Sequence, residues 1–513
     1  MALSVEEIKK RYKKCAAHKE EWRSIYEEAY EFCLPMRNMY SESGTPGQNK
    51  MKRVFDSTAV HSTARFANRI QSSLFPPQRP WCRLQPGNEI PEEQKIETQQ
   101  VLDFYTDKMF AVMMQSGFDL AMGEFLLDLA VGTSVMLIQP GDALTPIRYT
   151  AIPAYHIAFE DGPNGIPDTV YRTFSRPFNV IDREWPDANI PAEMAQTYQD
   201  DPTKKVELIE ATYTVDSKMY YCLLTAEGDT KLVSRDLKSW PWVISRYMKA
   251  SNENYGRGPV LFALGDIRTL NKVVELTLKN ASISIGGVFT AVDDGVLNPQ
   301  TISIVPGAVI GVSSNGGPRG PSLTPLPRSG DANLSQIVSN DLRTNIKKAL
   351  LDESLTPENM SARSATEINA KLQELSVSLG SAFGRLISET MFPIVRRSLE
   401  LMDEMGMIEL PLKVNGLEVT VVPQSPLAMA NNAERLNEVM QFMQITQMLG
   451  PVGQTLIKMD AVGDFIADQL GIPAALRTTQ EERQVMQEQM AEAAAMMAEQ
   501  ELGLQQPQEA ISQ

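Results

Sequence analysis

The sequence predicts an α+β protein, and three patterns support this fold class. Apolar residues recur at helical spacing over much of residues 4–130 and 258–406. Residues 146–247 instead alternate with a period of two and are rich in β-branched and aromatic side chains. Strands and helices do not alternate regularly, as they would in a doubly wound parallel sheet. A length of 513 residues allows roughly two to four domains with cores of their own.

The N-terminal region is predicted to be helical. Ser4 and Glu7 have the spacing of a capping box, and the helix that they start should end before Pro35. Asp56 or Ser57 can cap a second helix, which a Pro-Pro pair stops. One face of that helix carries Val60, Ala64, Ala67, Ile70 and Leu74.

The chain is then expected to return to a core at Trp81 and Leu84. Two further helical patterns follow, at about 92–114 and 120–130, and the second leads into a short apolar strand at 134–139.

Five strands are predicted in the β-rich region, at 147–159, 169–174, 206–215, 219–224 and 242–247. Asp216, Ser217 and Lys218 lie where a hairpin turn belongs. The pattern therefore favours strands that are mostly antiparallel.

The stretch from 255 to 367 predicts two helices around a small insert. Gly258 and Pro259 open a helix that extends to about residue 285, because proline is favoured in the first turn. Short strands at 288–292, 302–305 and 309–312 follow, and Asp331 can cap the second helix. Its apolar face carries Leu334, Val338, Leu342 and Ile346, and its opposite face carries Gln336, Ser339, Asn340, Arg343 and Lys347, with no acidic residue.

A polar loop at 352–363 precedes a long helix. Ser364 and Glu367 form a second capping box, and Pro393 should kink this helix before it ends at Gly406. We also expect a strand at 417–422, helices at 432–449 and 454–470, and a tail from residue 480 that is helical at first and then disordered.

Charge is distributed unevenly within the net value of −16. Residues 1–100 have a net charge of +3, whereas 101–250 have −8 and 401–513 have −11. A protein that grips DNA tightly clusters basic residues, because phosphate neutralisation supplies most of the affinity. The pattern argues against sequence-reading DNA binding but is compatible with DNA that passes without sticking.

Motifs for chemistry are missing from the sequence. No phosphate loop, GxSxG elbow or HExxH motif occurs, and the four cysteines and three histidines are widely spaced. Residues 255–258 could form a phosphate-cradling turn or a helix cap, and the pairs 293–294 and 200–201 could be metal carboxylates or turn acids. We expect a structural subunit without cofactor, metal or enzymatic activity, made in a reducing compartment.

Three clusters of residues show a family resemblance. They are FDSTAVHSTARFANRIQSSLFPPQRPWCRL at 55–84, YGRGPVLFALGDIRTLNK at 255–272, and the segment 364–397, which starts with Ser-Ala-Thr-Glu-Ile and ends near Met-Phe-Pro-Ile-Val-Arg. In this order the chain resembles the portal, or head-to-tail connector, of short-tailed bacteriophages. The second cluster, with YGxGP followed by an Asp and a Leu-Asn pair, is the most specific.

The resemblance implies a ring of twelve subunits at one capsid vertex of the virion, assembled in the host cytoplasm. Double-stranded DNA would pass through it without sequence-specific contacts during packaging and ejection. The implied partners are the large terminase subunit, then a tail adaptor, and capsid and scaffolding proteins, with no membrane. The alternatives are another ring-forming virion component, such as a tail adaptor or internal scaffold, or an enzyme of unfamiliar type.

Family architecture implies a division of the chain into named parts. These are N-terminal helices and an α+β wing (1–257), a stem helix (258–285), a clip (286–330), a second stem helix (331–351), a channel loop (352–363), a long kinked helix with a wing return (364–425), crown helices (426–479) and a partly disordered tail (480–513).

The same resemblance suggests candidate site residues. Arg343, Lys347, Asn359 and Arg363 are predicted to face DNA, and Asp293, Asp294 and Arg319 are predicted to dock partners at the clip.

Overall fold

The computed structural model divides the chain into two compact units. Unit 1 comprises Met1–Lys19, Ala67–Arg257 and Thr356–Gln513, and unit 2 comprises Glu20–Phe66 and Gly258–Leu355. The structure describes residues 3–37, 40, 50–87, 90, 92–226, 230–286, 289–291, 323–325, 332–352, 374–375, 377–409 and 419–448, together with isolated positions between 462 and 489.

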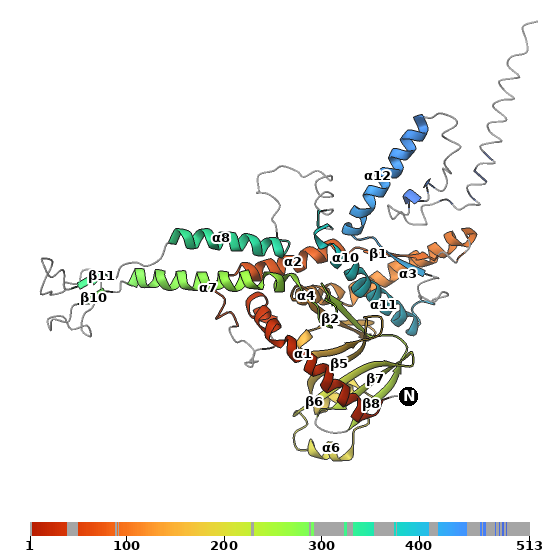
Figure 1. The fold of residues 1–513 in the computed structure, drawn as a ribbon. Helices are drawn as coiled ribbons and strands as arrows, with labels where there is room; N and C mark the ends of the chain where they lie inside the picture. Colours follow the sequence, from red (N-terminus) through yellow and green to blue (C-terminus); the bar gives the residue numbers. More distant parts are fainter. Residues whose placement is uncertain are drawn as a thin grey trace, which may run out of the picture. The chain divides into compact units, whose positions relative to one another are not determined.

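Unit 1 is built around an antiparallel sheet with the order β4-β5-β6-β7-β8 (Figure 1). Its strands are β4 (Ile157–Asp161), β5 (Pro167–Pro177), β6 (Lys205–Val215), β7 (Lys218–Thr225) and β8 (Lys231–Leu237). The predicted hairpin turn is confirmed: Val215 pairs with Lys218, and Asp216 and Ser217 between them both have positive φ. Such a two-residue turn matches the twist of the strands that it joins.

Helices cover both faces of this sheet. Ile8 and Cys15 of α1 (Val5–Cys33) pack against one face, on side chains such as Tyr171 and Tyr213. Ile181 of α5 (Phe178–Glu184) packs against the other face, and α6 (Ala192–Thr197) follows it along the chain. The capping box at the start of α1 is confirmed, because the Ser4 N–H donates to Glu7 Oε2 (2.9 Å) and the Glu7 N–H donates to Ser4 Oγ (3.3 Å).

Two smaller antiparallel sheets complete the β structure of unit 1. One has the order β3-β2-β9, from β3 (Ile147–Ile152), β2 (Thr133–Pro140) and β9 (Trp242–Arg246). The other pairs β1 (Cys82–Pro86) with β12 (Val419–Pro423).

The single strand predicted at 147–159 is wrong, because Pro153 precedes a short 3-10 turn (Ala154–His156) and β3 and β4 join different sheets. The sequence also did not reveal β8, since Ser234, Arg235 and Asp236 on it are exposed.

An aromatic core lies beside these sheets, next to α3 (Glu92–Gln115) and α4 (Phe118–Val131). Trp81 packs edge-to-face on Phe75 (5.1 Å between ring centroids) and Phe110 (5.2 Å). Trp81 and Leu84 are both buried, as predicted. Aromatic pairs of this geometry add stability beyond the area that they bury.

The long helix predicted after residue 364 is interrupted in the part that the structure describes. Gly380 has a positive φ of 47°, α10 (Ser381–Leu386) follows it, and a π-helical turn, η3 (Ile387–Met391), leads into α11 (Phe392–Glu404). The predicted irregularity near Pro393 is a π turn just before the proline. Helix α12 (Pro426–Met448) begins earlier than the predicted start at 432, and the helix predicted at 454–470 lies mostly outside the described residues.

Unit 2 consists mainly of helices. It contains the second part of α1, the 3-10 turn η1 (Pro35–Arg37), the first part of α2 (Thr58–Leu74), α7 (Pro259–Gly286) and α8 (Ala332–Ala349). α7 and α8 run side by side in opposite directions (Figure 1). Between them in the chain, β10 (Phe289–Ala291) pairs antiparallel with β11 (Leu323–Pro325). The predicted order of helix, β-containing insert and helix is confirmed, whereas the strands predicted at 302–305 and 309–312 lie outside the described residues.

Two features are absent from the described residues. None of their helices is long and apolar enough to cross a membrane. No group of three or more His, Cys, Asp or Glu side chains among them could hold a metal ion. The four cysteines are buried and unpaired, at Cys15, Cys33, Cys82 and Cys222.

Candidate functional site

Helix α8 carries the two predicted DNA-facing residues that the structure describes, Arg343 and Lys347. Lys347 is exposed on α8, but Arg343 is only partly exposed, because its guanidinium donates to Asp56 Oδ2 from Nη2 (2.8 Å) and Nε (3.1 Å). The other candidates lie outside the described residues: Asn359, Arg363, Asp293, Asp294 and Arg319.

Asp56 ties the start of α2 to α8. Besides binding Arg343, its Oδ1 accepts the Thr58 N–H (2.9 Å), which makes Asp56 the cap of α2. Burial by itself would raise the pKa of Asp56, but the hydrogen bonds from Thr58 and Arg343 outweigh it, and the pKa is lowered. The sequence predicted the cap but not the ion pair.

Asn271 of α7 holds the segment that precedes α2. Its Oδ1 accepts the N–H groups of Phe55 (2.7 Å) and Asp56 (3.3 Å), and its Nδ2 donates to the Arg53 carbonyl (2.9 Å). Asn271 belongs to the Leu-Asn pair of the YGRGP cluster, so this signature residue has a structural role.

Asp352 provides the second tie between α2 and the end of α8. It is buried, accepts the Ser62 hydroxyl (2.7 Å) and pairs with Arg65 (3.1 Å). The start of α2 therefore binds Arg343 on α8 and Asp352 just beyond its end, and these two contacts fix which face of α8 is buried. Ser339 and Ile346 are buried, whereas the predicted apolar position Val338 is substantially exposed and the predicted polar-face residue Ser339 is not.

Basic side chains of α7 and α8 are mostly neutralised. Arg268 pairs with Glu28 (2.6 Å), and Lys272 and Lys279 share Glu275. Among the described basic residues of these two helices, only Lys347 and Lys348 lack an ion pair within the described part of the chain. They are the side chains that remain available to an external anion.

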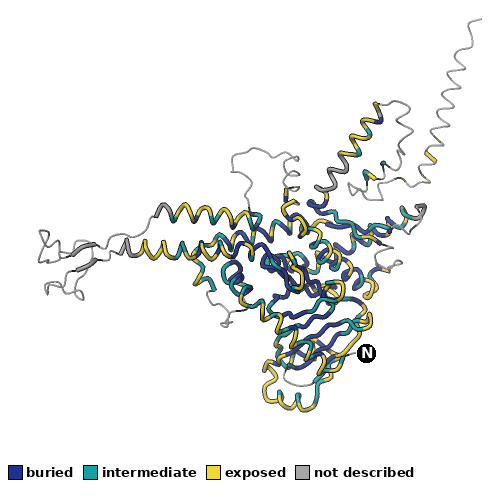
Figure 2. The backbone as a smooth tube through the Cα atoms, in the orientation of Figure 1, coloured by how far each residue is buried: buried dark blue, intermediate teal, exposed yellow. Residues whose placement is uncertain are grey.

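The same two helices expose large apolar side chains. Figure 2 shows how much of the described length of α7 and α8 is exposed. Four of them are more than half exposed: Phe262 (59%), Leu276 (53%), Leu278 (54%) and Ile337 (59%). Phe262 and Leu276 are fourteen residues apart and share one face of α7, whereas Leu278 is turned to another face by the helical repeat. Large apolar side chains exposed on two faces of α7 and on α8 are typical of a surface that binds a partner.

The YGRGP turn is a packed turn rather than a phosphate cradle. Tyr255 is buried, and its ring centroid lies 4.7 Å from that of Phe159. The Gly256 N–H donates to Thr133 Oγ1 (2.8 Å), so it is not available to a phosphate. A Cβ on Gly256 would lie 2.5 Å from the Gly132 carbonyl oxygen, which explains why glycine stands there.

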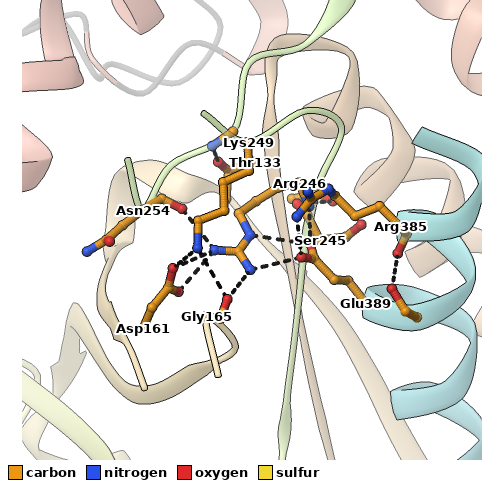
Figure 3. Close-up of polar contacts among 12 residues, drawn as sticks. Thr133, Asp161, Gly165, Ser245, Arg246, Lys249, Asn254, Arg385 and Glu389 are labelled. Carbon is orange, nitrogen blue, oxygen red and sulfur yellow. Dashed lines mark hydrogen bonds and ion pairs between the residues drawn. The ribbon is translucent and has the colours of Figure 1, made fainter. Parts of the chain in front are cut away.

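A buried ion cluster lies beside this turn in unit 1 (Figure 3). The Arg246 cluster consists of Arg246, Asp161, Glu389, Lys249 and Arg385. Arg246 donates to Asp161 (2.8 and 3.0 Å) and to Glu389 (2.9 and 3.3 Å), and Lys249 and Arg385 bind the same two carboxylates. Carbonyl oxygens of Gly165 and Asn254 accept the remaining guanidinium N–H groups. Every donor of Arg246 is therefore satisfied inside the fold.

Sequence reasoning missed Asp352, Arg246 and Glu389 as organising residues. No local pattern marks the pairs that join distant segments: Arg246 and Glu389 are 143 positions apart, and Asp352 and Ser62 are 290 positions apart. The Leu-Asn pair of the YGRGP cluster was the only signal that pointed to Asn271.

Similarity to solved structures is weak. A neck of the native gene transfer agent particle, computed with C12 symmetry, is 14% identical and covers 78% of this chain and 92% of its own, with a TM-score of 0.34. A virion of the native gene transfer agent particle gives 12% identity, coverage of 75% and 86%, and a TM-score of 0.33. Scores this low do not establish a common arrangement of the whole chain, so the assignment depends on sequence.

Sequence similarity is more extensive. A "Probable portal protein" of Bordetella phage BPP-1 is 23% identical over 91% of this chain and 87% of its own length. The portal protein of Escherichia phage T7 is 26% identical over 33% of this chain and 32% of its own, and that of Enterobacteria phage T3 is 24% identical over 48% and 45%. These matches confirm the resemblance to portal proteins.

The family match covers nearly the whole chain. Residues 5–477 match the family described as "Bacteriophage head to tail connecting protein". This range includes the packed YGRGP turn, the two helices that flank the insert and the Arg246 cluster. The chain therefore belongs to the bacteriophage head-to-tail connecting protein family.

Proposed function

We propose that this protein is the portal subunit of a phage and that it assembles into a ring of twelve copies at one capsid vertex. The ring would be the conduit for DNA during packaging and ejection, and the docking site for the terminase motor and then for the tail adaptor. Family membership and the portal proteins among its relatives support this assignment. Its role is structural, and the virion is where it acts.

The exposed apolar residues of α7 and α8 are the observation that best supports a ring. A pair of helices with apolar side chains on more than one face needs partners on more than one side. In a closed ring each copy has two neighbours, which meet it through two different surfaces. Leu276 on one face and Ile337 on the neighbouring helix would then be covered by adjacent copies.

Imaging of the purified protein by negative-stain electron microscopy tests the ring. We expect particles with twelve-fold symmetry and a central hole, and a protein that stays monomeric would contradict the proposal. Leu276→Asp should prevent ring formation, because it places a charge in the proposed interface. Asn345→Asp adds the same charge at an exposed polar position of α8 and should leave the rings intact.

A conduit needs weak contacts with its cargo. The acidic net charge of −16 repels phosphate, and a few free cations can provide salt-sensitive contacts. We propose that Lys347, with its neighbour Lys348, supplies such contacts, and that Arg343 joins them where its pair with Asp56 leaves donors free.

Packaging assays can separate DNA contact from stability. Lys347→Ala with Lys348→Ala should reduce the length of packaged or retained DNA while rings still form. Arg343→Ala with Lys347→Ala should do the same, but it also removes the partner of Asp56, so its thermal stability must be measured too. Lys272→Ala is the matched control, since Lys272 is already neutralised by Glu275. Full-length packaging in both double variants would contradict the DNA-facing assignment.

The loop at 352–363 and the clip complete the proposal. We propose that Asn359 and Arg363 of this loop contact DNA, and that Asp293, Asp294 and Arg319 of the clip dock the terminase and the adaptor in turn. Deletion of the loop should preserve ring assembly and reduce packaged DNA. Charge reversal at the three clip positions should weaken terminase binding to assembled rings, measured in a pull-down with purified motor.

A further inference from the structure

One short helix of unit 1 is bounded by an irregular joint at each end. α10 is preceded by Gly380, whose φ of 47° and ψ of −121° lie outside the helical region. It is followed by the π turn Ile387–Met391, where the Phe392 N–H donates to the Ile387 carbonyl five residues back. Pro393 comes next and has no N–H group to donate. α10 is thus the only described part of this helical run that has a joint on both sides.

The π turn leaves a buried hydroxyl without a partner. Three other buried threonines in described helices donate to the carbonyl four residues back: Thr63 to Ala59 (2.7 Å), Thr106 to Leu102 (2.7 Å) and Thr446 to Phe442 (2.9 Å). Thr390 Oγ1 is buried with no hydrogen-bond partner. In an α-helical register, Thr390 could form the same bond to Leu386. The π register therefore lacks the hydrogen bond from the Thr390 hydroxyl to the Leu386 carbonyl that an α register would form.

The Arg246 cluster stabilises the π register. Glu389 lies within the π turn, and it accepts the Arg246 backbone N–H (2.9 Å) as well as two donors of the buried guanidinium. Arg385 of α10 donates to the same carboxylate (2.9 Å). Without the Glu389 carboxylate, the buried Arg246 guanidinium would keep only one of its two carboxylate partners, Asp161, and a buried charge without its partner is costly.

We propose that the π turn is a two-state hinge, and that Glu389 is the latch that holds it in the π register against Arg246 and Arg385. Release of the latch would let the turn adopt the α register and so form the Thr390 bond. A change of one residue in register rotates a helix by about 100° and shifts it by about 1.5 Å. Gly380 would absorb that movement. α11 would stay in place, because seven of its 13 residues are buried, whereas the six-residue α10 has only two buried residues to repack, Ala382 and Leu386. The inference concerns unit 1 alone and does not depend on the proposed function.

Hydrogen exchange on the full-length protein tests the latch. Glu389→Gln keeps the size of the side chain and removes its charge. We expect amide exchange in residues 381–391 to accelerate about tenfold or more, with residues 394–404 unchanged. Ser388→Ala is the control, since Ser388 is exposed in the same turn and does not contact Arg246. Unchanged exchange in 381–391, or an equal acceleration across α11, would overturn the proposal.

Two more variants keep the test decisive if Glu389→Gln does not fold. Arg385→Gln removes only the ion pair between Arg385 of α10 and Glu389. It should accelerate amide exchange in residues 381–391 by a smaller factor than Glu389→Gln does. Deletion of Ser388 removes the extra residue of the π turn and should place the run in the α register. That deletion is expected to slow amide exchange at Thr390. A deletion variant with the wild-type exchange pattern would contradict the proposal that the turn can adopt two registers.

Discussion

Two sets of ion pairs, one in each unit, use the same residue types in different surroundings. In unit 1 the Arg246 side chain is 0% exposed and its two carboxylate partners are 10% and 12% exposed. In unit 2 the Arg268 side chain is 61% exposed and its partner Glu28 is 28% exposed. Water screens the second pair and not the first. The difference teaches that burial, not the presence of an arginine–glutamate pair, decides which pair organises the fold.

Arg343 lies between these two extremes. Its side chain is 38% exposed, while Asp56 on the other side of the pair is nearly buried. The arginine can therefore hold α2 through Asp56 and still present part of its guanidinium to solvent. Such a half-buried position is compatible both with the ion pair to Asp56 and with the DNA contact that we propose for Arg343.

Arg246→Met should have the largest effect. It leaves two carboxylates buried without their main partner, and we expect the free energy of unfolding to fall by about 3–5 kcal/mol. Chemical denaturation at constant protein concentration measures this loss. A loss below about 1 kcal/mol would show that the charges of Asp161 and Glu389 are balanced without Arg246, either by water or by Lys249 and Arg385. The buried Arg246 pairs and the exposed Arg268–Glu28 pair would then contribute similar free energies.

Gly256→Ala tests how tightly the backbone encloses the Arg246 cluster. The new methyl group would lie 2.5 Å from the Gly132 carbonyl oxygen and 2.8 Å from Arg246 Cβ. We expect a loss of about 1–3 kcal/mol in the free energy of unfolding, because backbone must move. Gly384→Ala is the control: no atom lies within 4 Å of its Cβ position, and the change should stabilise α10 by up to about 1 kcal/mol.

Asp56→Asn tests the intermediate pair through its pH dependence. The pKa of Asp56 is lowered from 3.8, so its ionised form stabilises the folded state above that pH, and this stabilisation disappears as the pH falls through the lower, folded value. The variant should be less stable than wild type at neutral pH, and the gap should close in acid. A gap that stays constant down to about pH 2 would mean that the Asp56 charge is not what stabilises α8.

Arg268→Met should have the smallest effect of the series. The pair with Glu28 is exposed and screened, so we expect no resolvable change in the unfolding midpoint at physiological salt. Measurement at low salt should reveal a slight destabilisation. A loss as large as that of Arg246→Met would overturn the comparison.

The sequence predicted local features of both units well. The Ser4–Glu7 capping box, the Asp216–Ser217 turn, the start of α7 at Pro259 and the insert between two helices are all confirmed. Each depends on residues a few positions apart, so a single sequence contains the necessary information. The break at Gly380 was missed because glycine is also tolerated inside helices, and nothing nearby in the chain shows that its φ becomes positive.

The site was less predictable than the elements. Lys347 was placed on an exposed helix face, as its spacing indicated, but the pairing of Arg343 with Asp56 could not be read from residues 287 positions apart. Ser339 is buried for the same reason: α8 is oriented by Asp56 and Asp352 contacts rather than by its own apolar pattern.

By itself, the sequence determined where several helices and turns begin, the acidic balance of the chain and its membership of the head-to-tail connecting protein family. Only the tertiary structure decided which charges became buried, that Asn271 holds the segment before α2, and that Glu389 joins a π turn to Arg246. The physical reason is range. Caps and periodicity depend on hydrogen bonds and contacts within one or two turns, whereas a buried charge is stable only beside partners that folding brings together from distant parts of the chain.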